Sequence, residues 1–163
     1  MLDLFFRLAY RNAYRLMRIY WGVTHPQVHG ALVAIWHDGK ILLVQNSYVP
    51  YRSLPGGYVH SRETGRDAAL RELREETGIH VAATDLQPVI DEQHEWEGKH
   101  EHIEIFDLDV SERPRVEIDN REVVDAGFFS PEEALRLPLF PPIRRVIERR
   151  MGKAAHGLAH PTN

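Results

Sequence analysis

The strongest constraint on the fold of this chain is a run of glutamates on a helix predicted over residues 64–77. Glu72, Glu75 and Glu76 stand at positions i, i+3 and i+4, which lie on one face of a helix. Crowding three carboxylates there is unfavourable unless a cation offsets them, and Arg71 supplies one positive charge only. Ligand sets made of oxygen favour magnesium, manganese or calcium over softer metals. The helix therefore predicts a site for a divalent cation.

A proline-glycine-glycine turn at residues 55–57 comes shortly before this helix. Its two glycines let the backbone approach a ligand closely, and their carbonyl groups are available to a metal. The helix itself has a capping signal in Thr64 and Asp67, and Gly78 stands where it should end. A turn that leads into an acidic helix, with a cation between them, suits a polyanion. The residues alone predict metal-assisted hydrolysis of a phosphorylated compound. The alternative is a solvated acidic helix face.

The length, composition and charge of the chain limit its fold class and its binding partners. The chain has 163 residues, 43% of them hydrophobic and 27% charged, which is typical of one globular domain. It has no cysteine, which excludes disulfides and thiolate metal sites and suits a reducing compartment, so we expect a cytoplasmic protein. Residues 1–22 carry four arginines and one aspartate, a charge of +3. Because the net charge of the whole chain is −4, the remaining residues carry −7. The acidity of this domain argues against binding to duplex nucleic acid.

The order of apolar runs and breaks predicts a mixed α/β sheet flanked by helices. We divide the chain into a basic amphipathic helix (1–22), a catalytic domain (28–151) and a flexible tail (152–163). A hairpin signal, Asp38-Gly39, separates the first two predicted strands. The predicted strands are 28–36, 40–44, 80–83, 89–93, 102–110 and 123–129, with a polar stretch at 95–101, and the later predicted helices are 131–137 and 142–151.

Residues 57–79 resemble the signature of the Nudix hydrolases, a MutT-like family, which reads G-x5-E-x7-R-E-U-x-E-E-x-G-U with U a bulky aliphatic residue. Every fixed position is matched. The resemblance implies an α/β/α sandwich and Mg²⁺-dependent hydrolysis of a nucleoside diphosphate linked to another moiety. The alternative is a Nudix-fold nucleotide-binding or regulatory module without turnover. The matching residues are Gly57, Glu63, Arg71, Glu72, Leu73, Glu75, Glu76, Gly78 and Ile79.

The resemblance also implies roles for single residues. Glu72, Glu75 and Glu76 would bind Mg²⁺ or Mn²⁺ together with the carbonyl group of Gly56. Arg71 would orient these glutamates. The signature at residues 57–79 is called the Nudix box, and the resemblance implies that another of its residues, Glu63, closes the loop or holds a metal-bound water.

The general base is left open between two glutamates. Some members of the family use a glutamate of the box, for which Glu72 is the candidate. Others use an acidic residue from a later loop, for which Glu122 is the candidate because it precedes the strand predicted at 123–129. Of the two, we favour Glu72, which the box places beside the metals.

The expected substrate is a small nucleotide whose identity the sequence leaves open. Trp96, Tyr58 and Tyr51 are candidates for stacking on a base, and we place Trp96 in a charged loop. His94, His100 and His102 lack a convincing metal spacing and are interpreted as polar surface or substrate-loop residues. Glu101 and Glu104 are interpreted as solvated charges at a strand edge.

The N-terminal segment is predicted to be helical from Leu2 to Trp21, with its arginines along one stripe and large apolar residues over much of the rest. Two interpretations are open. The segment packs on its own domain or across a homodimer, or it lies on an anionic membrane surface. We favour the first, because the apolar arc is wide and rich in aromatic residues.

Overall fold

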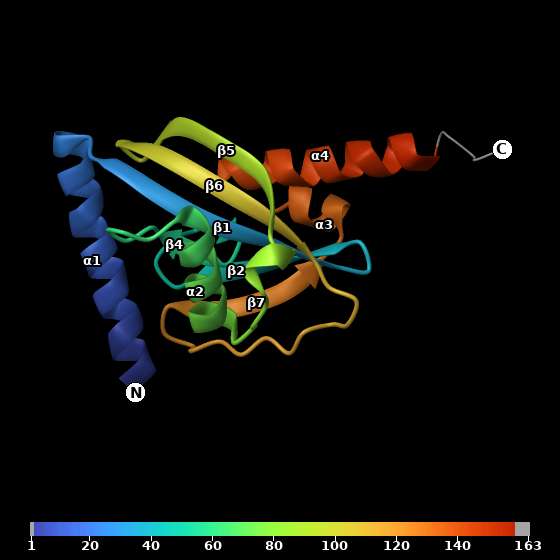
Figure 1. Ribbon diagram of the computed structural model, residues 1–163. Coiled ribbons are helices and arrows are strands. Elements are labelled where there is room, and N and C mark those ends of the chain that lie inside the picture. Colours follow the sequence, from blue (N-terminus) through green and yellow to red (C-terminus); the bar gives the residue numbers. More distant parts are fainter. Residues whose placement is uncertain (1, 159–163) are drawn as a thin grey trace.

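The computed structural model describes the backbone of residues 2–158 and the side chains of residues 3–152. It forms one mixed sheet flanked by helices (Figure 1). The elements are α1 (Leu2–Thr24), β1 (Gln27–His37), β2 (Lys40–Asn46), β3 (Arg52–Ser53), β4 (Gly56–Tyr58), α2 (Gly65–Thr77), the 3₁₀ turn η1 (Ala83–Asp85), β5 (Gln87–Trp96), β6 (Lys99–Asp109), β7 (Val123–Phe129), α3 (Pro131–Leu135) and α4 (Pro141–Leu158).

The sheet follows the order β3-β2-β1-β6-β5. β1 and β6 run parallel, and the other recorded pairs are antiparallel. β1 and β2 pair beside the Asp38-Gly39 turn and then diverge, with β4 taking the place beside β1 and β7 the place beside β2. The diverging strands leave room between them for a cavity, and they bring the glycine turn of β4 next to the central strand.

A helical layer covers each face of the sheet. α2 packs on one face through Ala68, Ala69 and Leu73, all fully buried against side chains from β1 and β6. α3 and α4 cover the other face, where Ile143 and Ile147 are fully buried. This confirms the predicted α/β/α sandwich.

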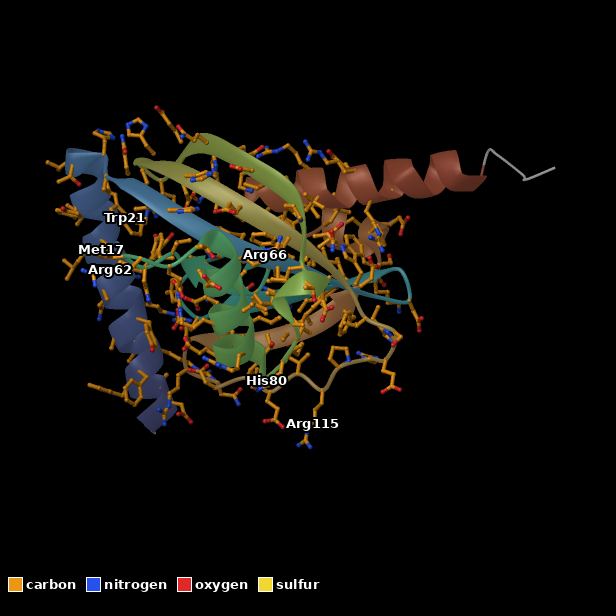
Figure 2. The ribbon with its side chains drawn as sticks, in the orientation of Figure 1. Met17, Trp21, Arg62, Arg66, His80 and Arg115 are labelled. Atoms are coloured by element: carbon orange, nitrogen blue, oxygen red, sulfur yellow. The ribbon has the colours of Figure 1, made fainter. Side chains whose placement is uncertain are left out.

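The boundaries of α2 are as predicted. Thr64 is its N-cap and accepts a hydrogen bond from the amide of Asp67, and Gly78 ends it in the left-handed region at φ 72°. Arg66, in the first turn, donates to the carbonyl of Leu86 at 2.6 Å and so ties the helix to the segment after η1 (Figure 2).

Three sequence predictions need correction. Residues 80–83 are not a strand: Ile79 and Val81 pack toward α2, so their alternation reflects burial rather than pairing. The polar stretch at 95–101 is not a separate loop, because β5 and β6 continue through it and join at Glu97-Gly98. Both turn residues have positive φ (50° and 81°), as in the tight hairpin turns that suit twisted strands.

The third correction concerns the C-terminus. α4 continues to Leu158, beyond the predicted end at Met151, so the segment interpreted as a tail begins as helix. Residues 159–163 of that segment lie outside the described residues.

α1 contacts the domain along one face and exposes the other. Arg11 donates to the carbonyl of Ser47 at 2.8 Å, and Arg7 to that of Asn120 at 2.9 Å. No helix in the described part of the chain is long and apolar enough to cross a membrane. That a second copy of the chain or a membrane surface covers the outer face of α1 remains a prediction. The large apolar residues on that face are Leu4, Phe5, Leu8, Leu16, Met17, Ile19, Tyr20 and Val23.

Candidate active site

The two glycines of β4 bring the backbone against the glutamates of α2. Gly56 has φ 147°, and a Cβ atom there would lie 2.2 Å from the carbonyl oxygen of Ala31, so only glycine fits. Its amide donates to Oε2 of Glu76 at 2.9 Å. A Cβ atom at Gly57 would lie 2.5 Å from Oε1 of Glu72. Turn and helix therefore meet as the sequence predicts.

Arg71 organises the acidic residues around it. Its guanidinium donates to both carboxylate oxygens of Glu63, at 2.9 and 3.0 Å, and to Oε1 of Glu72 at 2.6 Å. The hydrogen bonds from Arg71, with a backbone bond from His60, lower the pKa of Glu63 to about 2. Glu63 is thus an ionised partner that fixes Arg71 and, through it, Glu72. The carboxylate of Glu75 lies 3.5 Å from Arg71 and is 55% exposed, at the outer edge of the cluster.

The carboxylate of Glu76 is in a setting that disfavours its anion. Burial first, and then the nearby charges of Glu72 and Glu122, outweigh the hydrogen bond from the amide of Gly56 and raise its pKa to about 8. Without a cation, a carboxylate in this position holds its proton near neutral pH. A divalent ion would offset this repulsion.

Glu122 reaches the same cluster from the loop before β7. The carboxylate of Asp119 accepts three backbone N–H groups, from Arg121, Glu122 and Val123, which fixes the shape of this loop. The hydroxyl of Tyr48 donates to Oε1 of Glu122 at 3.0 Å. Burial raises the pKa of Glu122, the hydrogen bond from Tyr48 lowers it, and the charges of Glu72 and Asp119 raise it.

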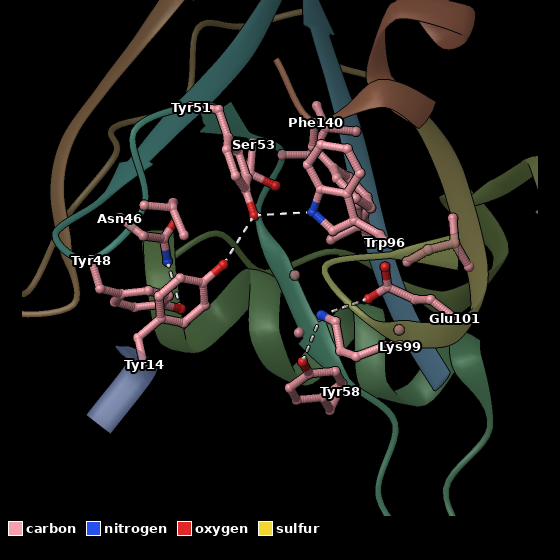
Figure 3. Close-up of a pocket in the computed structure, with 17 residues that line it drawn as sticks. Tyr14, Asn46, Tyr48, Tyr51, Ser53, Tyr58, Trp96, Lys99, Glu101 and Phe140 are labelled. Atoms are coloured by element: carbon pink, nitrogen blue, oxygen red, sulfur yellow. Dashed lines mark hydrogen bonds and ion pairs between the residues drawn. The ribbon is translucent and has the colours of Figure 1, made fainter. Parts of the chain in front are cut away.

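A cavity of about 150 Å³ opens beside the glycine turn (Figure 3). Gly56 and Gly57 line it together with aromatic rings, among which Trp96 meets Tyr51 and Phe140 edge to face. It is smaller than a typical drug-sized pocket, so it suits one group of a ligand. The aromatic residues that line it are Tyr14, Tyr48, Tyr51, Tyr58, Trp96 and Phe140.

All three residues predicted to contact substrate line this cavity, although Trp96 has a different setting from the one predicted. It ends β5 instead of standing in a loop, and its ring packs 5.6 Å from that of Phe140. Its indole N–H donates to the hydroxyl of Tyr51 at 3.3 Å. Tyr58 is 44% exposed at the rim.

The floor of the cavity holds charged residues that sequence reasoning missed. Lys99 is 5% exposed, and its ammonium group lies 3.5 Å from Glu101 and 3.3 Å from the hydroxyl of Tyr58 (Figure 3). Glu101 is 6% exposed, so the interpretation as a solvated edge charge is wrong. Its Oε2 has no hydrogen-bond partner and His94 lies 3.5 Å away. The alternation of β6 would have revealed this inward position, because Ile103 and Ile105 share it.

Comparison with known proteins gives a consistent result. A family model described as the NUDIX domain matches residues 26–150. A CTP pyrophosphohydrolase from Escherichia coli K12 is 35% identical over 111 residues, which cover 66% of this chain and 78% of that protein. The crystal structure of a MutT NUDIX hydrolase from Burkholderia pseudomallei is 28% identical with a TM-score of 0.65, over 75% of this chain and 96% of that one.

Other similarities are shorter. An ADP-ribose pyrophosphatase from Methanocaldococcus jannaschii is 44% identical over 45 residues, which are 26% of this chain and 27% of that protein. For three of the curated relatives it matches, the chain spans about a third of the relative's length, between 27% and 36%. With these three relatives the chain therefore shares a segment rather than the whole length.

Proposed function

The chain belongs to the Nudix family, and from this premise we propose that it hydrolyses the diphosphate bond of a nucleoside diphosphate linked to another moiety. The observation that carries the proposal is the convergence of Glu72, Glu76 and Glu122 at the glycine turn beside an aromatic cavity. Carboxylates gathered at a turn suit a metal-bridged diphosphate, and the cavity suits a flat ring system.

The residues present fit Mg²⁺ or Mn²⁺. The donors around the turn are oxygen atoms, and a bound cation would offset the burial and the neighbouring carboxylates that raise the pKa of Glu76. Glu72, Glu76 and the carbonyl group of Gly56 would hold the ion, with Glu75 at the exposed edge. When bound, the ion supplies charge neutralisation for the diphosphate and acidifies water.

We assign the general base to Glu122 in preference to Glu72. A base needs a free carboxylate oxygen and a pKa closer to neutral than that of an ordinary glutamate. Glu122 has its pKa raised by burial and is oriented by Tyr48. Glu72 instead accepts a hydrogen bond of 2.6 Å from Arg71, which fixes its carboxylate beside the glycine turn, where a cation would bind.

The aromatic rings would hold the base or another flat group of the substrate. Stacking on such rings is tolerant of base identity, whereas Glu101 and Lys99 at the floor are suited to reading hydrogen-bonding groups on the ring edge. The substrates named for related proteins include ADP-ribose and CTP. We propose a nucleotide of this class as the substrate, with small-molecule chemistry and no duplex nucleic acid.

A panel of nucleoside diphosphate derivatives, incubated with Mg²⁺ or Mn²⁺ and analysed by mass spectrometry, tests the function. Cleavage to a nucleoside monophosphate and a phosphorylated second product, dependent on the ion, is expected. The alternative is a binding module without turnover. Tight nucleotide binding with no product from any member of the panel would favour that alternative and overturn the proposal.

A further inference from the structure

A second cluster of potential metal ligands lies on the face of the sheet that α2 covers. His29 on β1 is the parallel partner of His102 on β6, and Glu104 follows two residues later on the same face. Nε2 of His29 lies 2.7 Å from Oε1 of Glu104. One ligand atom from each of the three residues lies within 4.8 Å of the others. The sequence spacing of the histidines on β6 gave no sign of this, because His29 comes from another strand.

The two imidazoles lie face to face on neighbouring strands. Their rings stack with centroids 4.2 Å apart and planes 16° apart. Asp91 on β5 is the register partner of Glu104, and its Oδ1 lies 2.7 Å from Nε2 of His102. Three adjacent strands thus present two nitrogen and two oxygen donors on one face.

Glu104 is held in place by a feature of α2. A Cβ atom at Gly65, the first residue of the helix, would lie 2.1 Å from Oε1 of Glu104, so the missing side chain makes space for the carboxylate. The carboxylate therefore lies against the first turn of α2 while it contacts the imidazole of His29, so its position is fixed from both sides. The side chains of Glu104, His29 and His102 are 24%, 33% and 36% exposed, so an ion can reach them from solvent.

We propose that His29, His102 and Glu104 bind a transition metal of the zinc class, with Asp91 as the fourth ligand. Ligands of a tetrahedral zinc ion lie roughly 3.3 Å apart, given metal–nitrogen distances of about 2.0–2.1 Å. The ligand atoms of His29, His102 and Glu104 lie within 4.8 Å of one another. Binding would require the stacked imidazole rings to turn so that both nitrogens face the ion, with Asp91 joining through its contact with His102. Imidazole nitrogen favours zinc, nickel and copper, whereas the oxygen donors of the active site favour magnesium and manganese.

The cluster is separate from the candidate active site. Gly65 and Glu76 are eleven residues apart on α2, roughly 16 Å along a helix axis at 1.5 Å per residue. A metal at the second site would join β1, β6 and β5 near the start of α2. It would stabilise the fold by mass action without touching the diphosphate.

Isothermal titration of the full, untagged chain with Zn²⁺, in excess Mg²⁺ to occupy the carboxylate site, tests the proposal. We expect one zinc ion for the wild type, and His102→Asn should weaken its binding at least tenfold. His100→Asn is the matched control, because His100 is on the same strand and face but outside the cluster. It should bind zinc as the wild type does, and so should Glu76→Gln, which alters the other site.

The same measurement on His29→Asn repeats the test from the neighbouring strand, and thermal unfolding without zinc shows whether each variant folds. Nitrogen NMR of the imidazoles adds an independent readout, in which zinc should shift the Nε2 signals of His29 and His102 together. Zinc binding that survives in both His29→Asn and His102→Asn would overturn the proposal. Failure of the wild type to bind zinc would do the same.

Discussion

The ammonium group of Lys99 lies 4.3 Å from the centre of the Trp21 ring, which joins α1 to the floor of the cavity. Lys99 belongs to β6, and Trp21 lies on α1 before the start of the region matched by the family model. Tyr14, also on α1, donates a short hydrogen bond to Glu97 and lines the cavity (Figure 3). The N-terminal helix is therefore part of the cavity wall, and a domain boundary at residue 22 or 26 would divide it.

Replacing Tyr14 by alanine should weaken substrate binding while sparing the chemistry. Loss of an aromatic wall costs about 1–3 kcal/mol of stacking energy, so KM should rise about tenfold with kcat within about twofold. Leu16→Ala, on the exposed face of α1, is the matched control and should leave both constants unchanged. Steady-state kinetics on the substrate found in the panel measures this. Equal KM values for the two variants would contradict a role for α1 in the cavity.

Removing residues 1–22 should distinguish a role of α1 in the cavity from a role in the carboxylate site. Mg²⁺ affinity should be retained, because the glycine turn, Glu72 and Glu76 lie outside the deleted segment. KM should rise at least as much as in Tyr14→Ala. Calorimetric titration with Mg²⁺, alongside circular dichroism to confirm folding, makes the measurement. A folded, truncated protein that no longer binds Mg²⁺ would show that α1 supports the carboxylates.

Glu76→Gln should keep the fold and lower turnover by about 10² or more. The substitution preserves shape but removes the charge that a divalent ion needs, and loss of one electrostatic contact of this kind typically costs about that much. Glu133→Gln is the control, because Glu133 caps α3 through the amide of Ser130, away from the cluster. Unchanged turnover in Glu76→Gln at the same Mg²⁺ concentration would remove Glu76 from the site.

The box and its local structure could be predicted from the sequence, whereas contacts between distant segments could not. The caps of α2 and the turn before it depend on residues close in sequence, such as Thr64 and Gly78, and these predictions were confirmed. The burial of Glu101 could have been predicted only by extending the alternation of Ile103 and Ile105 back through the polar stretch, which the sequence analysis interpreted as a break between strands. By contrast, the pairing of His29 with His102 follows from the parallel register of β1 and β6.

Without metal, the stability of the protein should fall as pH rises from about 4.5 to about 8 through the effect of Glu76. Its folded pKa is raised from 4.5 to about 8, so the folded state holds a proton that the unfolded chain releases. Where the folded state binds more protons, stability decreases with increasing pH. The lowered pKa of Glu63 acts in the opposite sense, but in the window from 4.5 down to about 2.

Thermal unfolding in EDTA at pH 5.5 and 8.5, compared between the wild type and Glu76→Gln, isolates this group. At pH 5.5, one pH unit into this window, the Tm values of the two proteins should be closer together than at pH 8.5. At pH 8.5 the Tm of the variant should be higher than that of the wild type. The difference should be at least about 2–4 °C if ionisation of Glu76 costs about 1 kcal/mol or more in a chain of this size. A constant difference in Tm at both pH values would contradict the raised pKa.

The identity of the general base can be decided by measuring turnover and Mg²⁺ affinity together. If Glu122 takes the proton from water, Glu122→Gln should lower turnover by about 10²–10⁴-fold, the range for general-base catalysis, with Mg²⁺ affinity within about twofold. Glu72→Gln should lower both, because Glu72 contacts the glycine turn where the ion would bind. Tyr48→Phe removes the hydroxyl that orients Glu122 at 3.0 Å and should reproduce part of the loss of turnover without changing Mg²⁺ affinity. Full turnover in Glu122→Gln would exclude this residue and return the role to Glu72.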